Sequence, residues 1–202
     1  MNKIILDGQP ITPSKILCVG RNYVEHIHEL GNEMPDSMVL FIKPNSAISD
    51  TLYAMKDEPL HYEGELCFLY RGGRFAAVGF GLDLTKRTLQ AQLKAKGLPW
   101  ERAKAFDGSA VFSPFVTLED QTDLSFTLAI NEEPRQQGDP GLMIYKPAEI
   151  LAELQTFVTL EEGDIIMTGT PQGVGQVNAG DRFAAMVFAG AEPIISAAWT
   201  AE

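Results

Sequence analysis

Short apolar runs broken by turn residues are the dominant pattern along the chain. Glycine, proline or aspartate closes most of these runs, which is typical of β-strands joined by turns. A Gly72-Gly73 pair separates two of them and predicts a hairpin. The predicted strands cover residues 14–19, 39–42, 66–70, 75–82, 125–130, 164–167 and 182–188.

Helical periodicity is confined to a few segments. In the longest, Leu89 and Leu93 share one face, Thr85 is placed to cap the start, and Gly97 ends the helix. Strands outnumber helices and do not alternate regularly with long helices, as a doubly wound parallel sheet would require, so a β-rich α+β fold is predicted. The predicted helices cover residues 22–30, 84–96 and 149–156.

The composition is that of a soluble globular protein with an acidic balance. The 202 residues predict one domain over positions 1–202, and 16 basic against 27 acidic residues give a net charge of −11. This charge argues against nucleic acid or an anionic membrane as a partner. Cys18 and Cys67 lie in apolar runs and predict buried thiols in a reducing compartment. With no signal peptide or membrane span recognisable, a cytoplasmic location is expected.

Two glutamates enter an apolar run at residues 63–68. Glu63 and Glu65 lie on the same face of a strand because side chains alternate. They could belong to a solvent-facing strand end, or they could bind Mg²⁺, Mn²⁺ or Ca²⁺ through hard carboxylate oxygens. Asp83 ends the paired strand and could cap the next helix or supply a third ligand. Taken together, the three carboxylates favour a metal site.

Four basic residues lie in the predicted segments around these carboxylates. Arg21, Lys43, Arg87 and Lys104 would by default be surface charges, but around a bound cation they would suit a small anionic keto acid.

His26 and Glu29 are three residues apart, so on a helix they can pair and activate a water. His28 falls on a different face.

Residues 163–175 form a strand that runs into a glycine-rich loop without the lysine of a P-loop. The loop is either a tight turn or an anion cradle with the Thr170 hydroxyl as a donor.

In order along the chain, these segments resemble the fumarylacetoacetate hydrolase family, in particular its short acylpyruvase-like members. The resemblance runs from about residue 15 to residue 181. Its matching pieces are Gly20-Arg21-Asn22-Tyr23, His26 with Glu29, Phe41-Ile42-Lys43-Pro44, Glu63-Gly64-Glu65-Leu66, Asp83 with Thr85, Arg87 and Gln90, Lys104 within residues 103–107, and residues 163–175.

The resemblance implies a mixed β-roll of bent sheets, a homodimer, and roles for the site residues. Mg²⁺ or Mn²⁺ would be bound by Glu63, Glu65 and Asp83, and His26 with Glu29 would activate the hydrolytic water. Lys104 would stabilise developing enolate charge. The substrate's keto-acid oxygens would be held by Arg21, Lys43, Arg87, Gln90 and Thr170.

The activity that the resemblance implies is hydrolysis of the carbon–carbon bond of an acylpyruvate such as fumarylpyruvate or acetylpyruvate. The alternatives are oxaloacetate decarboxylation or tautomerisation, isomerisation of a 2-oxo-diene diacid at the same site, and a non-catalytic metal-binding protein. Two departures from the family pattern, Lys86 and Thr88, bear on substrate choice. The stretch after Asp181 also matches weakly.

Overall fold

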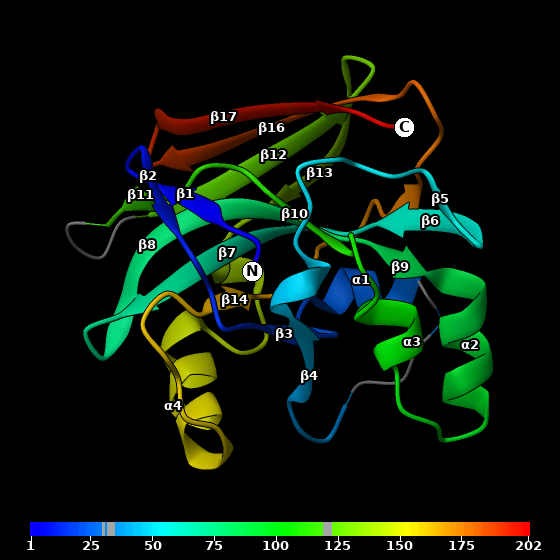
Figure 1. The fold of residues 1–202 in the computed structure, drawn as a ribbon, viewed down its shortest axis with the longest axis horizontal. Coiled ribbons are helices and arrows are strands. Elements are labelled where there is room, and N and C mark those ends of the chain that lie inside the picture. Colours follow the sequence, from blue (N-terminus) through cyan, green and yellow to red (C-terminus); the bar gives the residue numbers. More distant parts are fainter. Residues whose placement is uncertain (30, 32–34, 119–122) are drawn as a thin grey trace.

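A computed structural model describes residues 1–29, 31, 35–118 and 123–202, and a mixed sheet lies at its centre (Figure 1). The late strand β14 (Ile165–Met167) is inserted between two early ones, parallel to β3 (Lys15–Gly20) and antiparallel to β7 (Gly64–Arg71). The other pairings in this sheet are antiparallel. In spatial order the strands are β10 (Ala110–Phe112), β8 (Arg74–Asp83), β7 (Gly64–Arg71), β14 (Ile165–Met167), β3 (Lys15–Gly20) and β4 (Val39–Pro44), with β11 (Val116–Thr117) also on β8.

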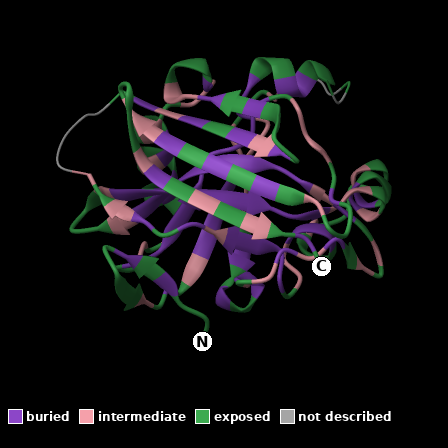
Figure 2. Ribbon diagram, turned by 90° about the horizontal axis from the view of Figure 1, so that it is seen from above, coloured by how far each residue is buried: buried purple, intermediate pink, exposed green. Residues whose placement is uncertain are grey.

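A second, antiparallel sheet covers the curved β7–β8 hairpin (Figure 1). Buried and exposed residues alternate along its strands (Figure 2), because one face packs on the core and the other faces outward. Phe126 and Phe183 from this sheet join Phe80 from β8 in the largest buried apolar cluster. Its strands, in spatial order, are β13 (Glu133–Gly138), β12 (Leu124–Ile130), β16 (Arg182–Ala189) and β17 (Glu192–Thr200).

Short strands and helices complete the fold. Strand β1 (Ile4–Leu6) pairs with β2 (Gln9–Ile11). A small sheet contains β5 (Met55–Lys56), β6 (Glu58–Tyr62), β9 (Thr85–Lys86) and β15 (Gly175–Gln176). The α-helices are α1 (Val24–Glu29), α2 (Arg87–Ala95), α3 (Glu101–Lys104) and α4 (Pro147–Phe157), and the 3₁₀ helices are η1 (Asn45–Ala47) and η2 (Pro140–Leu142).

The predicted β-rich α+β fold of bent sheets is confirmed, and so are the seven predicted strands and the glycine hairpin. Helix α3 was not predicted, nor were the strands β1, β2, β5, β6, β9, β10, β11, β13, β15 and β17. The short helix at 22–30 is α1, although position 30 lies outside the described residues. Among those residues, none of the helices has both the length and the apolar character that a membrane crossing needs.

The predicted start of the helix at residues 84–96 is wrong, and α4 rather than this helix is the longest among the described residues. Thr85 and Lys86 form strand β9, which pairs with β6, and helix α2 begins only at Arg87. Thr85 is buried and does not cap the helix. Instead, Glu58 from β6 accepts hydrogen bonds from the backbone N–H groups of Thr88 and Leu89, at 2.8 and 3.3 Å. A carboxylate distant in sequence thus occupies the positive end of the helix.

Candidate active site

Three buried carboxylates meet where the β7–β8 hairpin ends. Glu63 and Glu65 flank the start of β7, Asp83 ends β8, and the Asp83 N–H donates to the Glu63 carbonyl at 2.9 Å. This antiparallel register brings one oxygen of each side chain within 4.8 Å of the other two. We call these residues, Glu63, Glu65 and Asp83, the carboxylate triad.

Lys104 is the central counter-charge of the triad. Its ammonium lies 2.7 Å from Glu63 Oε2, 2.7 Å from Asp83 Oδ2 and 2.6 Å from Thr85 Oγ1. Burial alone would lower the pKa of Lys104, but Asp83 and Glu63 outweigh it and raise this pKa. Lys104 therefore stays protonated in a buried position, held by two carboxylates.

Two further cations flank the triad on different sides. The Arg87 guanidinium contacts Glu63 Oε1 at 2.5 Å and donates to Gln90 Oε1 at 2.8 Å. Lys43 lies 2.8 Å from Asp83 Oδ1, is fully buried, and donates to the backbone carbonyls of Lys104 and Ser109. The structure thus places Lys43 behind Asp83 and outside the pocket lining, rather than where it was predicted to bind substrate.

Glu63 and Glu65 differ sharply in their electrostatic surroundings. Burial opposes ionisation of Glu63, but Lys104 and Arg87 overcome it and lower its pKa. Burial raises the pKa of Glu65 well above its usual range, and the charges of Asp83 and Glu63 raise it further. Glu65 Oε2 accepts a hydrogen bond from the Gly169 N–H at 2.7 Å. Glu65 is therefore the carboxylate that most needs an added cation.

The donor set fits a hard divalent cation. It consists of carboxylate oxygens without a cysteine or histidine among them, which suits Mg²⁺ or Mn²⁺. Asp83 Oδ1 receives no well-directed hydrogen bond from the described residues, although Lys43 lies beside it. Asp83 Oδ1 and the Glu65 carboxylate are therefore oxygens that could bind such a cation.

His26 and Glu29 form the predicted pair on α1. His26 Nδ1 lies 3.1 Å from Glu29 Oε2, and Glu29 Oε1 accepts from the Gly173 N–H at 3.0 Å. If Nδ1 carries the proton that binds Glu29, Nε2 is free to accept one. His26 is buried and lines the same pocket as the triad, whereas His28 is exposed.

The glycine-rich loop is fixed by a buried glutamine. Gln136 on β13 accepts from the Gly64 N–H at 2.9 Å and donates to Thr170 Oγ1 at 2.8 Å and to the Pro171 carbonyl at 2.9 Å. The Thr170 hydroxyl in turn donates to the Gly64 carbonyl at 2.9 Å. Thr170 therefore already uses its hydroxyl proton inside the protein. The turn needs glycine at Gly173, where φ is +98° and a Cβ would collide with the Arg135 carbonyl.

Replacing Gln136 with Met is expected to lower the free energy of unfolding by about 2 kcal/mol, because the buried Gly64 N–H and Thr170 hydroxyl each lose a partner. Urea unfolding measures the change. Gln137→Met, at the exposed neighbouring position, is the matched control and should change stability by less than about 0.5 kcal/mol. Equal effects of the two substitutions would contradict a structural role for the buried amide.

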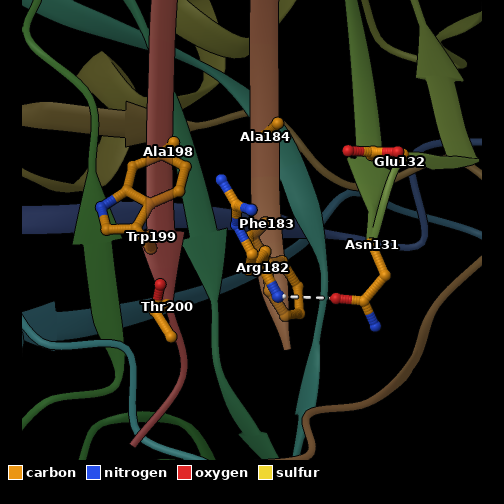
Figure 3. A pocket seen from close by; sticks show the side chains of 8 residues that line it. All are labelled: Asn131, Glu132, Arg182, Phe183, Ala184, Ala198, Trp199 and Thr200. Carbon is orange, nitrogen blue, oxygen red and sulfur yellow. Dashed lines mark hydrogen bonds between the residues drawn. The ribbon is translucent and has the colours of Figure 1, made fainter. Parts of the chain in front are cut away.

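The pocket that contains these groups is narrow and charged. About 40 Å³ of it is open, and its walls also include Arg21, Phe41, Lys94 and Trp100. A larger hollow of about 400 Å³ lies at the ends of β16 and β17 beside the β12–β13 turn (Figure 3). Its charged lining side chains are Glu132 and Arg182 alone, and the hydrogen bond drawn there joins the Arg182 N–H to Asn131. The narrow pocket is therefore the candidate active site.

Comparison with known proteins relates this site to one family. The family model described as fumarylacetoacetate (FAA) hydrolase C-terminal matches residues 15–74 and 75–194, which extends beyond residue 181, where the sequence resemblance weakened. The chain is 40% identical over 187 residues to the oxaloacetate tautomerase YcgM of Escherichia coli, covering 83% of this chain and 85% of that protein. It is 40% identical over 189 residues to the mitochondrial oxaloacetate tautomerase FAHD1 of Homo sapiens, covering 84% and 85%.

A solved structure extends the similarity to the fold. The fumarylpyruvate hydrolase of Pseudomonas aeruginosa, crystallised with Mn²⁺ and pyruvate, superposes with a TM-score of 0.86 at 30% identity. The match covers 100% of this chain and 96% of that one.

Proposed function

This chain belongs to the fumarylacetoacetate hydrolase family, and from that premise we propose that it is a divalent-metal-dependent oxaloacetate tautomerase. The observation that carries the proposal is the carboxylate triad with Glu65 left without a cationic partner among the described side chains. The 40% identity to two oxaloacetate tautomerases, one bacterial and one mitochondrial, supports oxaloacetate as the substrate.

The charges of the pocket suit a dianion once a divalent ion is present. The three negative charges of the triad are matched by the three positive charges of Lys43, Lys104 and Arg87. A bound Mg²⁺ or Mn²⁺ would add two positive charges to these six side chains and would supply Lewis-acid polarisation of a 2-oxo group. Arg21 also lines the pocket, so the loaded site would be positive and would attract a dicarboxylate.

The residues of this chain can move the proton that tautomerisation requires. Enol and keto oxaloacetate differ in the position of one proton, which moves between the oxygen on C2 and carbon C3. His26 Nε2 would accept and return that proton, and Glu29 would stabilise the imidazolium formed in between. Arg87 Nε is buried and donates no hydrogen bond within the described residues, so it can donate to a substrate oxygen. Lys104 would stabilise negative charge on the enolate.

Hydrolysis of an acylpyruvate is the second candidate, and the His26–Glu29 pair favours it. The same pair could deprotonate a water that attacks the distal carbonyl, so that the carbon–carbon bond breaks and pyruvate leaves as its enolate. The similarity to a fumarylpyruvate hydrolase supports this candidate. In either reaction the protein has to stabilise the enolate of a 2-oxo acid.

A substrate panel tests the two candidates. Decay of the ultraviolet absorbance of enol-oxaloacetate should accelerate with protein and Mg²⁺ or Mn²⁺, and should return to the uncatalysed rate with EDTA. Acetylpyruvate and fumarylpyruvate report hydrolysis, and pyruvate formation from oxaloacetate reports decarboxylation. If oxaloacetate is untouched while an acylpyruvate is cleaved, the second candidate replaces the first. Turnover of none of them would refute both.

Replacing His26 with Asn is expected to lower kcat for tautomerisation or hydrolysis by about 100-fold or more, because the proton acceptor is lost while a donor to Glu29 remains. Decarboxylation of oxaloacetate needs no base and should fall by less than about 3-fold. His28→Asn, on the exposed face of the same helix, is the control. Equal loss of all activities would assign His26 a structural role.

A further inference from the structure

The His26–Glu29 pair contacts the glycine-rich loop through Glu29. The two oxygens of this carboxylate have different partners, since Oε2 lies 3.1 Å from His26 Nδ1 while Oε1 accepts from the Gly173 N–H at 3.0 Å. The Glu29 side chain is 31% exposed and lies at the end of a short helix, so burial does not fix its rotamer. The Gly173 N–H therefore determines how the carboxylate faces the imidazole.

Tyr62 holds the other polar group of Gly173. The Tyr62 hydroxyl donates to the Gly173 carbonyl at 3.0 Å, and Gly175 on β15 is the register partner of Tyr62 on β6. A Cβ at Gly175 would come within 3.1 Å of the hydroxyl oxygen, so the missing side chain leaves room for this bond. Because the carbonyl and the N–H belong to the same residue, fixing the carbonyl restricts the direction of the N–H that Glu29 receives.

The Tyr62 ring is itself fixed in the core. Tyr62 is 4% exposed, and its ring packs edge-on against Phe183 with the ring centroids 5.2 Å apart. A buried aromatic ring with a polar end can pack on the core and still direct its hydroxyl at a partner. Tyr62 is not among the described residues that line the active-site pocket. It can therefore influence the reaction only through the groups that it holds.

We propose that Tyr62 is a positioning residue, which acts through Gly173 and Glu29 to keep the proton of His26 on Nδ1 and to leave Nε2 open to the substrate. The inference rests on the proposed function, in which Nε2 accepts and returns the substrate proton. A neutral imidazole carries its proton on one nitrogen or the other, and the hydrogen bond at one nitrogen selects the form. A Glu29 carboxylate turned away from Nδ1 would let the proton move to Nε2, where it prevents proton acceptance.

Replacing Tyr62 with Phe removes the hydroxyl and keeps the ring in the core. In Mg²⁺-loaded protein, kcat for tautomerisation, or for acylpyruvate hydrolysis if that is the reaction found, is expected to fall by about 5-fold or more, the effect of losing one ordinary hydrogen bond. KM and the rise in Tm on addition of Mg²⁺ should not change, because the substrate and metal sites, including the neighbouring Glu63, stay intact. Tyr70→Phe, at the hairpin end of β7, is the control and should alter none of these quantities.

Combining this substitution with Glu29→Ala tests whether Tyr62 acts through Glu29. Glu29→Ala alone should lower kcat by about 10-fold or more, because the imidazolium loses its counter-charge. In the Glu29→Ala background, Tyr62→Phe should lower kcat by less than about 2-fold, since the carboxylate that it positions is already gone. The proposal is overturned if the two losses multiply, if Tyr62→Phe leaves kcat unchanged, or if KM and the response to Mg²⁺ are lost together with kcat.

The position of the His26 proton can be measured without substrate, which separates this test from that of the proposed function. In Mg²⁺-loaded protein at mildly alkaline pH, ¹⁵N NMR of the histidine rings distinguishes the two neutral forms, and His26→Asn assigns the signal. Wild-type His26 should carry its proton on Nδ1, and Tyr62→Phe should shift it towards Nε2. A protein that behaves in this way but turns over none of the substrates would contradict the proposed activity and leave the positioning of His26 by Tyr62 standing. A wild-type proton on Nε2, or one that Tyr62→Phe does not shift, would overturn the proposal.

Discussion

Replacing Glu65 with Gln is expected to lower metal-dependent turnover by about 1,000-fold or more and to abolish stabilisation of the protein by Mg²⁺ or Mn²⁺. Glu65 is the triad member without a basic side chain beside it, so its charge is the one most available to a cation. The neutral amide of glutamine keeps the shape of the glutamate side chain, and its oxygen can still accept the hydrogen bond from the Gly169 N–H. Activity assays and thermal melts with and without the metal measure the two losses.

In the metal-free protein, we expect the same substitution to have the opposite effect and to stabilise the fold. Burial and two neighbouring carboxylates raise the pKa of Glu65, so the folded state binds a proton more tightly than the unfolded state does. The contribution of Glu65 to the free energy of unfolding is greatest below its pKa in the unfolded chain, about 4.3. It is lost as the pH rises through the higher pKa of the folded state. In EDTA at neutral pH, Glu65→Gln should therefore raise the Tm, by at least about 2 °C.

Glu162→Gln is the control for both measurements, because Glu162 is exposed and accepts a hydrogen bond from the Gly72 N–H, away from the triad. A Glu65→Gln protein that still gains stability from Mg²⁺, or that melts lower than the wild type in EDTA, would remove Glu65 from the metal site.

Replacing Lys104 with Met is expected to destabilise the protein by about 3–5 kcal/mol, because two buried carboxylates lose their shared counter-charge. The exposed Arg102→Met, on the same helix, should cost less than about 0.5 kcal/mol. Urea unfolding in EDTA compares the two. Addition of Mg²⁺ should recover part of the loss in Lys104→Met, since a divalent ion can take over part of the neutralisation. Near-equal stabilities would mean that the ammonium is not needed to keep these carboxylates buried.

The carboxylates could be anticipated from the sequence because their geometry is local. Glu63 and Glu65 share a face through strand alternation, and the glycine hairpin brings Asp83 back beside them. The His26–Glu29 pair lies within one helical turn. In each case the spacing along the chain determines the spacing in space.

The groups that sequence reasoning missed depend on contacts between distant segments. Gln136 lies on a polar strand, residues 133–138, that has no apolar alternation, so neither β13 nor the glutamine gave a signal. Glu58 replaces Thr85 at the start of α2 from a separate strand. Lys43 resembled the other basic residues of the site, and only packing shows that it lies behind Asp83.

The position of β14 has a consequence for biosynthesis. This strand, residues 165–167, fills the gap between β3 and β7, which leave the ribosome more than 90 residues earlier. Until it arrives, β3 and β7 each lack a neighbour and expose unpaired backbone groups, the state in which nascent sheets aggregate. The Gly169 N–H that binds Glu65 arrives with the same segment. The central sheet and the acidic site are therefore completed together, late in translation, and a chain interrupted before β14 would need protection from its own open edges.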